Sequence, residues 1–341
     1  MNFGIIGYGA IGRTHAQVIE NLAGANLIAI ATRTPEKART AGEKHRCAFY
    51  TDYREMLKRD DIDIVTICAP AVLHLPMALD AAAAGKHCIV EKPIEIDTER
   101  SERIIEAYDK RGLALSVIFQ HRFDPPSRLI KDAIDGGAFG GLNYGTAKTI
   151  WFRDEDYYRA TVWRGAWDGD GGGALMNQAI HSIDLLQYFM GPVEAVCGKY
   201  DTLYHWEIET EDIGVALLRF KSGAIGVIEG MTLAWPGRHS EVCVFGRLGS
   251  AGIRNDALEH YCFKAGNDPR FEALLGRGKE DSFKHLSFAR QYEDVIDAVK
   301  RGRPPLITGQ EGLKSVKLIM GIYESSKKMN GCESTDLSNA I

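Results

Sequence analysis

The chain has 341 residues, 45% hydrophobic and 26% charged, with a formal net charge of −5 at pH 7. This length predicts two domains, and a chain of this composition can bury a sizeable core without disulfides or metals. The absence of a concentrated basic stretch argues against a nucleic-acid partner. The chain also lacks a run of about 18 uninterrupted apolar residues, so no membrane span is predicted.

The first 120 residues alternate short apolar runs with helix-like segments. The apolar runs predict strands at 3–6, 27–31, 64–68, 87–90 and 115–119. The segments between them predict helices at 11–22, 35–44, 53–59, 75–84 and 98–110. Such alternation indicates an α/β domain, a doubly wound parallel sheet covered by helices on both faces, over residues 1–121.

The pattern changes after Gln120. A helix is predicted at 127–134, a strand at 144–151 and a helix near 174–190. Successive strands follow at 195–201, 213–221, 224–233 and 241–247, and two late helices at 283–301 and 310–329. Consecutive strands with short turns indicate a mostly antiparallel sheet, and therefore an α+β domain over residues 122–341.

The seven cysteines are scattered and contain no Cys-x-x-Cys pair. This distribution is typical of a reducing compartment and predicts no metal or redox motif. The N-terminus has no basic leader followed by a long apolar segment, so we expect a cytoplasmic protein.

A glycine motif follows the first predicted strand, with Gly7, Gly9 and Gly12 in the spacing G-x-G-x-x-G. Gly7 allows a tight turn, Gly9 lets the backbone approach a pyrophosphate, and Gly12 lets the next helix pack close to the strand. Ala10 and Ile11 begin that helix, whose free N–H groups suit phosphate oxygens. Glycine turns without ligands are common, but a strand before and a helix after predict a dinucleotide site.

The end of the second predicted strand bears on which dinucleotide is bound. An acidic residue there would bind the ribose 2′-hydroxyl of NAD, whereas this chain has Thr32, Arg33 and Thr34. Arg33 could face a 2′-phosphate, or it could be a solvated loop residue. The sequence therefore favours NADP(H), with NAD as the alternative.

A lysine follows the strand predicted at 87–90, within Glu91-Lys92-Pro93. It would lie at the carboxyl edge of the sheet, where ligands bind in open α/β folds. Lysine is usually a surface charge, but the strand end and the proline beside Lys92 favour a functional role.

Three polar residues follow the glycine run 171–173, and in a helix starting at Ala174 they share one face. These are Asn177, His181 and Asp184, spaced four and three residues apart. A lone helical histidine is usually structural, but one aligned with an amide and a carboxylate behind three glycines favours function.

Together these motifs resemble the Gfo/Idh/MocA oxidoreductase family, which includes glucose–fructose oxidoreductase and inositol dehydrogenases. The similarity covers nearly the whole chain and rests on the glycine motif, on Ala69-Pro70 followed by His74, on 84–87, on 91–93 and on 171–184. It implies a Rossmann domain, then an α+β substrate-binding domain whose large open sheet often builds homodimers or homotetramers, and whose last helix could pack back on the first domain.

The resemblance also implies site residues. Lys92 and His181 would be the catalytic pair, and Pro70, His74 and Glu91 would lie at the cofactor beside Lys92. Many members carry aspartate where this chain has Asn177. Relatives that act on nucleotide-linked uronic acids have a similar asparagine there.

The chemistry expected is hydride transfer at a carbinol carbon of a sugar, inositol, uronate or sugar nucleotide. Hydride leaves such a carbon only as its hydroxyl loses a proton, and histidine, with an ordinary pKa of about 6.5, can accept it near neutral pH. His181 would be that base, Lys92 would stabilise the developing alkoxide, and Asp184 would orient the imidazole. Lys92 as the base stays an open alternative.

An aromatic and arginine-rich segment at 151–165 precedes the helical block. Aromatic rings suit sugar faces and guanidinium groups suit carboxylates or phosphates, so Arg153, Tyr158 and Arg164 are the expected substrate contacts, with Arg122 a weaker candidate. The arginines hint at an acidic sugar. The same residues could instead cover the core or form oligomer contacts.

Two rival functions remain within the resemblance. Some relatives hydrolyse glycosides with a tightly bound dinucleotide and no net redox change, and one relative is a nucleotide-sensing regulator. Because both Lys92 and His181 are present, the sequence favours the oxidoreductase.

Overall fold

The computed structural model describes residues 1–276 and 281–329. The chain forms two compact units. The first comprises Met1–Arg128, Asp168–Gly171 and Arg277–Val316, and the second comprises Leu129–Trp167, Gly172–Gly276 and Lys317–Ile341. The domain boundary between residues 121 and 122 stays a prediction.

The first unit contains a six-stranded sheet in the order β3-β2-β1-β4-β5-β6, and every neighbouring pair is parallel. This order confirms the predicted doubly wound fold, which binds dinucleotides at the carboxyl edge of its strands. The short edge strand β3 was not predicted, because three residues carry no periodic signal. The strands are β1 (Asn2–Ile6), β2 (Asn26–Ala31), β3 (Ala48–Tyr50), β4 (Ile64–Ile67), β5 (His87–Val90) and β6 (Leu115–Val117).

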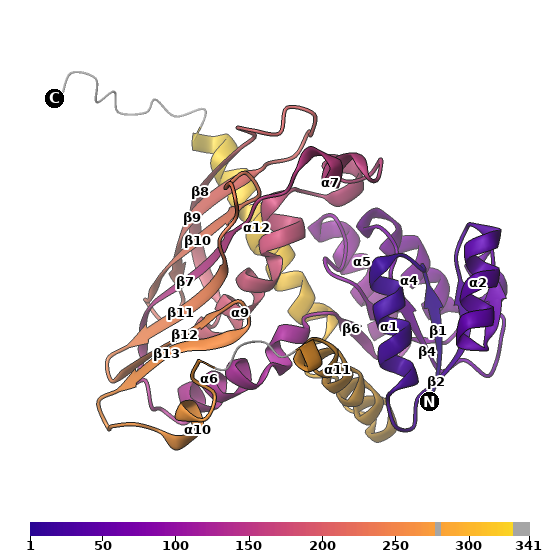
Figure 1. Ribbon diagram of the computed structural model, residues 1–341, viewed down its shortest axis with the longest axis horizontal. Coiled ribbons are helices and arrows are strands. Elements are labelled where there is room, and N and C mark those ends of the chain that lie inside the picture. Colours follow the sequence, from indigo (N-terminus) through magenta and orange to yellow (C-terminus); the bar gives the residue numbers. More distant parts are fainter. Residues whose placement is uncertain (277–280, 330–341) are drawn as a thin grey trace. The chain divides into compact units, whose positions relative to one another are not determined.

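Helices surround this sheet (Figure 1). Those between the strands are α1 (Ala10–Glu20), α2 (Pro35–His45), α3 (Tyr53–Leu57), η1 (Ala71–Leu73), α4 (His74–Ala83) and α5 (Thr98–Asp109), and η2 (Gln120–Phe123) follows β6. A late helix, α11 (Asp281–Arg301), packs against α1, and its Phe288, Tyr292 and Val295 join the core of the first unit. That core therefore combines segments from both ends of the chain.

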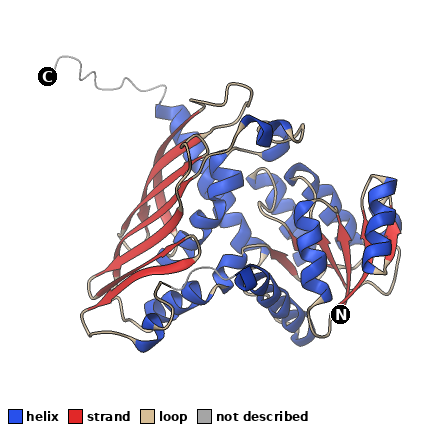
Figure 2. Ribbon diagram, viewed as in Figure 1, coloured by secondary structure: helices blue, strands red, loops and turns tan. Residues whose placement is uncertain are grey.

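The second unit contains one seven-stranded sheet in the order β13-β12-β11-β7-β10-β9-β8 (Figure 2). All neighbouring pairs are antiparallel except β7 with β10, which confirms the mostly antiparallel prediction. The last two strands, β12 and β13, were not predicted. The strands are β7 (Leu142–Ile150), β8 (Val193–Asp201), β9 (Ile213–Phe220), β10 (Ile225–Met231), β11 (Ser240–Gly246), β12 (Gly249–Arg254) and β13 (Ala257–Phe263).

One face of this sheet is covered by α9 (Ile180–Met190) and by the π-helix η3 (Ala174–Ala179) that leads into it. Glycines permit this close approach, since a Cβ on Gly230 would lie 2.7 Å from Leu175 Cδ2 and one on Gly145 would lie 2.8 Å from Met190 Sδ. Burial alternates along β9, whose outward side chains are exposed.

Five further helices complete the set of helices in the described part of the chain. They are α6 (Pro125–Asp135), α7 (Glu155–Arg159), α8 (Trp167–Asp170), α10 (Pro269–Glu272) and α12 (Gly309–Met329). None of the helices in the described part of the chain is both long and apolar enough to span a membrane.

Candidate active site

The glycine turn after β1 has the geometry that a dinucleotide requires. Gly7 has a φ of +97°, and a Cβ there would lie 2.6 Å from the carbonyl oxygen of Cys68. A Cβ on Gly12 would lie 2.2 Å from the carbonyl oxygen of Gly7, so only glycine lets α1 pack this close to the turn. A Cβ on Gly9 would meet no atom within 4 Å, so this backbone faces open space.

The N-terminus of α1 adds a second feature that fits a pyrophosphate. Gly9 is its N-cap residue, no side chain caps the first turn, and that turn has no acidic residue. The N–H groups at Ala10 and Ile11 are therefore not occupied by a capping side chain, and the helix dipole favours an anion there.

The segment after β2 is the one expected to distinguish the two nicotinamide dinucleotides. Thr32 follows the strand, Arg33 is exposed, and Thr34 is the N-cap residue of α2. The nearest following carboxylate is Glu36, in the first turn of α2. The choice of nucleotide at Arg33 stays a prediction.

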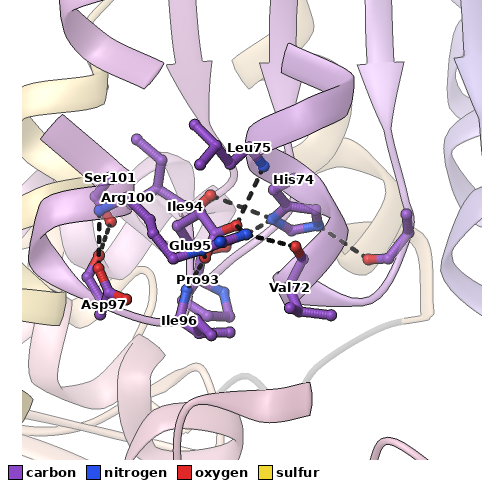
Figure 3. Close-up of polar contacts among 11 residues, drawn as sticks. Val72, His74, Leu75, Pro93, Ile94, Glu95, Ile96, Asp97, Arg100 and Ser101 are labelled. Carbon is purple, nitrogen blue, oxygen red and sulfur yellow. Dashed lines mark hydrogen bonds and ion pairs between the residues drawn. The ribbon is translucent and has the colours of Figure 1, made fainter. Parts of the chain in front are cut away.

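His74 joins the loop after β4 to the loop after β5 (Figure 3). Its ring is almost fully buried, with Nδ1 3.0 Å from the carbonyl oxygen of Pro93 and Nε2 2.9 Å from that of Ala69. Pro70, the residue after Ala69, is the N-cap residue of η1. Because both ring nitrogens contact backbone carbonyls, the geometry favours a role in shaping these loops, and direct contact of His74 with the cofactor stays a prediction.

A buried carboxylate fixes the loop that follows Lys92 (Figure 3). The Arg100 guanidinium donates to both oxygens of Glu95, at 2.7 and 2.8 Å, and also to the carbonyl oxygen of Val72. The backbone N–H groups of Leu75 and Ile96 donate to the same carboxylate. A bidentate, charge-assisted pair of this kind holds the loop in one geometry.

Lys92 is half-buried directly after β5. Since β1, β4 and β5 are neighbours in a parallel sheet, Lys92 and the glycine turn lie on the same edge of it. Glu91, the residue before Lys92, is buried and accepts a hydrogen bond from the Lys92 backbone N–H at 3.0 Å.

The helix expected to begin at Ala174 opens as a π-helix and becomes α-helical at Ile180. The sequence-based prediction placed Asn177 and His181 in one ordinary α-helix. This prediction was wrong for Asn177, which lies in the π-helical segment. Both side chains are half-buried, and Asp184 is buried. Short π-helical segments are often found at functional sites.

Glu211 holds the start of this π-helix. Its carboxylate accepts hydrogen bonds from the backbone N–H groups of Gly173 and Leu175 and from the Tyr323 hydroxyl, each at 2.8 Å. A Cβ on Gly173 would lie 1.9 Å from the Glu211 carbonyl oxygen, so the close approach requires glycine. Burial raises the pKa of Glu211 to about 7, against the lowering effect of these three donors.

This shifted pKa predicts a pH-dependent contribution to stability. Between the ordinary value of 4.5 and about 7, Glu211 binds a proton in the folded state and loses it on unfolding. Its contribution to the free energy of unfolding is thus complete below the ordinary pKa and falls by about 3 kcal/mol as pH rises through about 7. We expect wild type to lose stability relative to Glu211→Gln over this range.

Chemical denaturation of both proteins at about pH 5 and about pH 8 measures the difference. The glutamine variant adds a pH-independent offset, so the prediction concerns only the change of the difference with pH. Glu209→Gln, which removes an exposed carboxylate of the same segment, is the matched control. An unchanged difference would mean that Glu211 stays ionised in the folded protein.

Substrate-binding candidates are linked through a glutamine that the sequence analysis missed. Arg153 donates through Nε and Nη2 to Gln178 Oε1, at 3.2 and 2.8 Å. Gln178 Nε2 donates in turn to the Tyr157 hydroxyl at 2.7 Å and to Asn177 Oδ1 at 3.2 Å. The Arg164 guanidinium stacks over the Tyr157 ring at 4.0 Å. The structure thus brings Arg153, Arg164 and Asn177 into one network.

Other candidates are buried in contacts of their own. The Tyr158 hydroxyl lies 2.8 Å from Thr232 Oγ1, and Arg122 Nη1 donates to Glu311 at 2.8 Å. These contacts favour structural roles for both residues, and their contact with substrate stays a prediction. The neighbouring residue, Tyr157, is half-buried, and its ring lies beside the guanidinium groups of Arg153 and Arg164. Its place in the aromatic and arginine-rich segment 151–165 was the signal available in the sequence.

Comparison with known proteins follows the same division of the chain. Residues 1–119 match the family described as "Oxidoreductase family, NAD-binding Rossmann fold", and residues 127–252 match the "GFO/IDH/MocA C-terminal domain". An uncharacterized oxidoreductase, YrbE of Bacillus subtilis, is 33% identical over 94% of this chain and 93% of its own length. Myo-inositol 2-dehydrogenase of Thermotoga maritima is 28% identical over the full length of both chains.

Among solved structures, the WlbA dehydrogenase from Bordetella pertussis, in complex with NADH and UDP-GlcNAcA, is similar throughout. It has a TM-score of 0.88 and 31% sequence identity, and the match covers 96% of each chain.

Proposed function

Because the chain belongs to the Gfo/Idh/MocA oxidoreductase family with its NAD-binding Rossmann fold, we propose that it is a dehydrogenase acting on a hydroxyl of a sugar-like substrate. One observation carries this proposal. A glycine turn suited to a pyrophosphate, after β1, and the half-buried Lys92, after β5, lie on the same edge of one parallel sheet.

The bound nicotinamide supplies the hydride acceptor or donor, and the chain supplies the acid–base chemistry. We propose that His181 takes the hydroxyl proton of the substrate and that the Lys92 ammonium stabilises the oxygen as negative charge develops on it. Asn177 carries an amide, which can hold a hydroxyl but cannot act as a base. The buried Asp184 would help to orient His181.

The network around Gln178 points to an acidic substrate. Arg153 and Arg164 stack on the ring of Tyr157, and guanidinium groups suit carboxylates and phosphates. We propose a uronate or a nucleotide-linked uronic acid as the substrate class. The WlbA dehydrogenase, which binds UDP-GlcNAcA, supports this class, and the inositol dehydrogenase relatives keep cyclitols in the test.

The test is the change in nicotinamide absorbance with sugars, inositols, uronates and sugar nucleotides, each with NAD and NADP. We expect turnover to be fastest with an acidic sugar or sugar nucleotide. Cleavage of a chromogenic glycoside without net absorbance change would favour the redox-neutral reaction instead. Cofactor binding with neither reaction would favour a nucleotide-sensing protein.

We further propose that Arg33 binds the adenosine 2′-phosphate, so that the chain prefers NADP(H). Arg33→Asp should lower kcat/KM for NADP relative to NAD by about tenfold or more, because it removes a charge-assisted contact and adds repulsion. Arg39→Asp, the same change at an exposed position of α2, is the control. A wild-type preference for NAD would contradict the proposal.

We also propose a homodimer or homotetramer in the cytoplasm. Exposed apolar side chains on the outward face of the second unit's sheet, among them Leu217 and Ile225, favour a partner of the same chain. Light scattering of the purified protein measures the assembly, and a monomer at micromolar concentration would contradict it.

A further inference from the structure

A chain of buried polar side chains ends at the residue before Lys92. His15 Nε2 lies 2.8 Å from Glu91 Oε1, and His15 Nδ1 lies 2.8 Å from the Tyr292 hydroxyl. That hydroxyl lies 2.9 Å from Thr66 Oγ1. All four side chains are buried and come from α1, β4, the end of β5 and α11 within the first unit.

This network is electrostatically connected to Lys92. Burial alone raises the pKa of the Glu91 carboxyl, but the hydrogen bond and charge of His15, and then the charge and backbone N–H of Lys92, outweigh it. The resulting pKa lies below the ordinary value, so Glu91 is ionised at neutral pH. Because Coulomb attraction is mutual, the carboxylate that gains from the Lys92 ammonium also stabilises that ammonium.

Other titratable groups around Glu91 do not supply this negative charge. Burial raises the pKa of the Cys88 thiol to about 12 and that of the Cys68 thiol well above its ordinary value, so both stay neutral near pH 7. The Tyr292 hydroxyl also has a pKa raised by burial. Burial lowers the pKa of His74, on α4, so its ring carries no charge near pH 7. The Glu95 carboxylate is paired with Arg100.

We propose that Glu91 and His15 form a positioning pair for Lys92. Glu91 holds the Lys92 backbone through its N–H and keeps the side chain in the ammonium form, while His15 keeps the buried Glu91 ionised. Without a donor at His15, a carboxylate in this environment would take up a proton to avoid the cost of an unpaired buried charge. The inference rests on the proposed function in that Lys92 is the group that acts on the substrate.

The same unit contains a second glutamate–histidine–tyrosine trio, which serves as an internal control for Glu91, His15 and Tyr292. The Tyr8 hydroxyl lies 2.6 Å from His45 Nε2, and His45 Nδ1 lies 2.7 Å from Glu20 Oε1. The Glu20 carboxylate is partly exposed, and Lys92 has no part in its hydrogen bonds. Glu20→Gln thus makes the same chemical change as Glu91→Gln without removing the carboxylate beside Lys92.

The experiment follows the titration of Lys92 directly. Lysines are reductively methylated with ¹³C-formaldehyde, and the Lys92 resonance is assigned by its loss in Lys92→Arg. Glu91→Gln should move the Lys92 titration midpoint to lower pH by about one unit, since an adjacent opposite charge shifts such a midpoint by about one to three units. Glu20→Gln should leave it in place. Equal shifts in the two variants would overturn the proposal.

A pair of substitutions at His15 tests the second partner and covers a failure of Glu91→Gln to fold. The readout here is the protonation of Glu91 itself, followed through the ¹³C resonance of its carboxyl carbon. His15→Gln keeps an N–H that can donate to Glu91, so Glu91 should take up a proton near the same pH as in wild type. His15→Leu removes the donor, so Glu91 should take up a proton at a higher pH than in wild type. An unchanged Glu91 titration in His15→Leu would overturn the role of His15.

This readout separates the inference from the proposed function. The Lys92 midpoint is measured without turnover. If no substrate of the panel is turned over but the midpoint shifts as expected, only the dehydrogenase proposal is contradicted. Turnover together with an unshifted midpoint in Glu91→Gln would remove the positioning pair alone.

Discussion

His181→Ala should lower kcat/KM by about 10²–10⁴-fold, the contribution of a well-placed general base. His181 is half-buried in the first turn of α9, directly after the π-helix that carries Asn177. Removal of the imidazole leaves the hydroxyl proton of the substrate without its proposed acceptor. Steady-state kinetics on the best substrate of the panel measures the loss, and the fluorescence of the reduced nicotinamide cofactor that wild type prefers measures whether cofactor binding is retained.

Two further variants make this result specific. His260→Ala makes the same change on β13 of the same unit and should leave turnover near that of wild type. His181→Gln keeps a hydrogen-bonding side chain that cannot accept the proton. If His181→Gln retained activity within about tenfold of wild type, His181 would only position the substrate and Lys92 would become the base.

Lys92→Met should lower kcat by about 10²–10³-fold, which is the loss observed when one group that stabilises a developing oxyanion is removed. Methionine conserves most of the volume of the lysine stem, so the substitution removes the charge with little change in packing. Because the ammonium interacts more strongly with the developing alkoxide than with the neutral hydroxyl, kcat should fall by a larger factor than KM rises.

The control for Lys92→Met is Lys110→Met, at an exposed lysine that pairs with Glu106 at the end of α5. This control should keep wild-type kinetics, because a surface ion pair contributes little. A loss confined to KM in Lys92→Met would show that Lys92 binds the substrate without acting in the reaction. Normal turnover in both Lys92→Met and His181→Ala would contradict the proposed mechanism.

The sequence by itself determined the features that depend on neighbours along the chain. Apolar runs bounded by turn residues predicted five of the strands of the first sheet, because strands buried on both faces must be apolar throughout. The glycine spacing predicted the turn at Gly7, since a φ of +97° and the close approach at Gly12 both exclude a Cβ. The position of Lys92 after β5 followed from the same local pattern.

Short and glycine-rich elements were harder to predict. The edge strand β3 has three residues. The strands β12 and β13 were missed because β12 contains two glycines and its alternation is weak. The π-helix at Ala174–Ala179 was predicted as an ordinary helix. The start of this π-helix is held by Glu211, which accepts hydrogen bonds from the backbone N–H groups of Gly173 and Leu175. Helical periodicity in the sequence does not reveal a partner that lies so far along the chain.

Only the tertiary structure decided which distant residues meet. His15 and Tyr292 are 277 residues apart, and an amphipathic helix such as α11 does not reveal which surface its apolar face will cover. Tyr157 joins the arginine network while Tyr158 is buried, because adjacent residues of a helix point in different directions. Local propensity sets the elements, whereas long-range packing selects the side chains that surround Lys92 and Asn177.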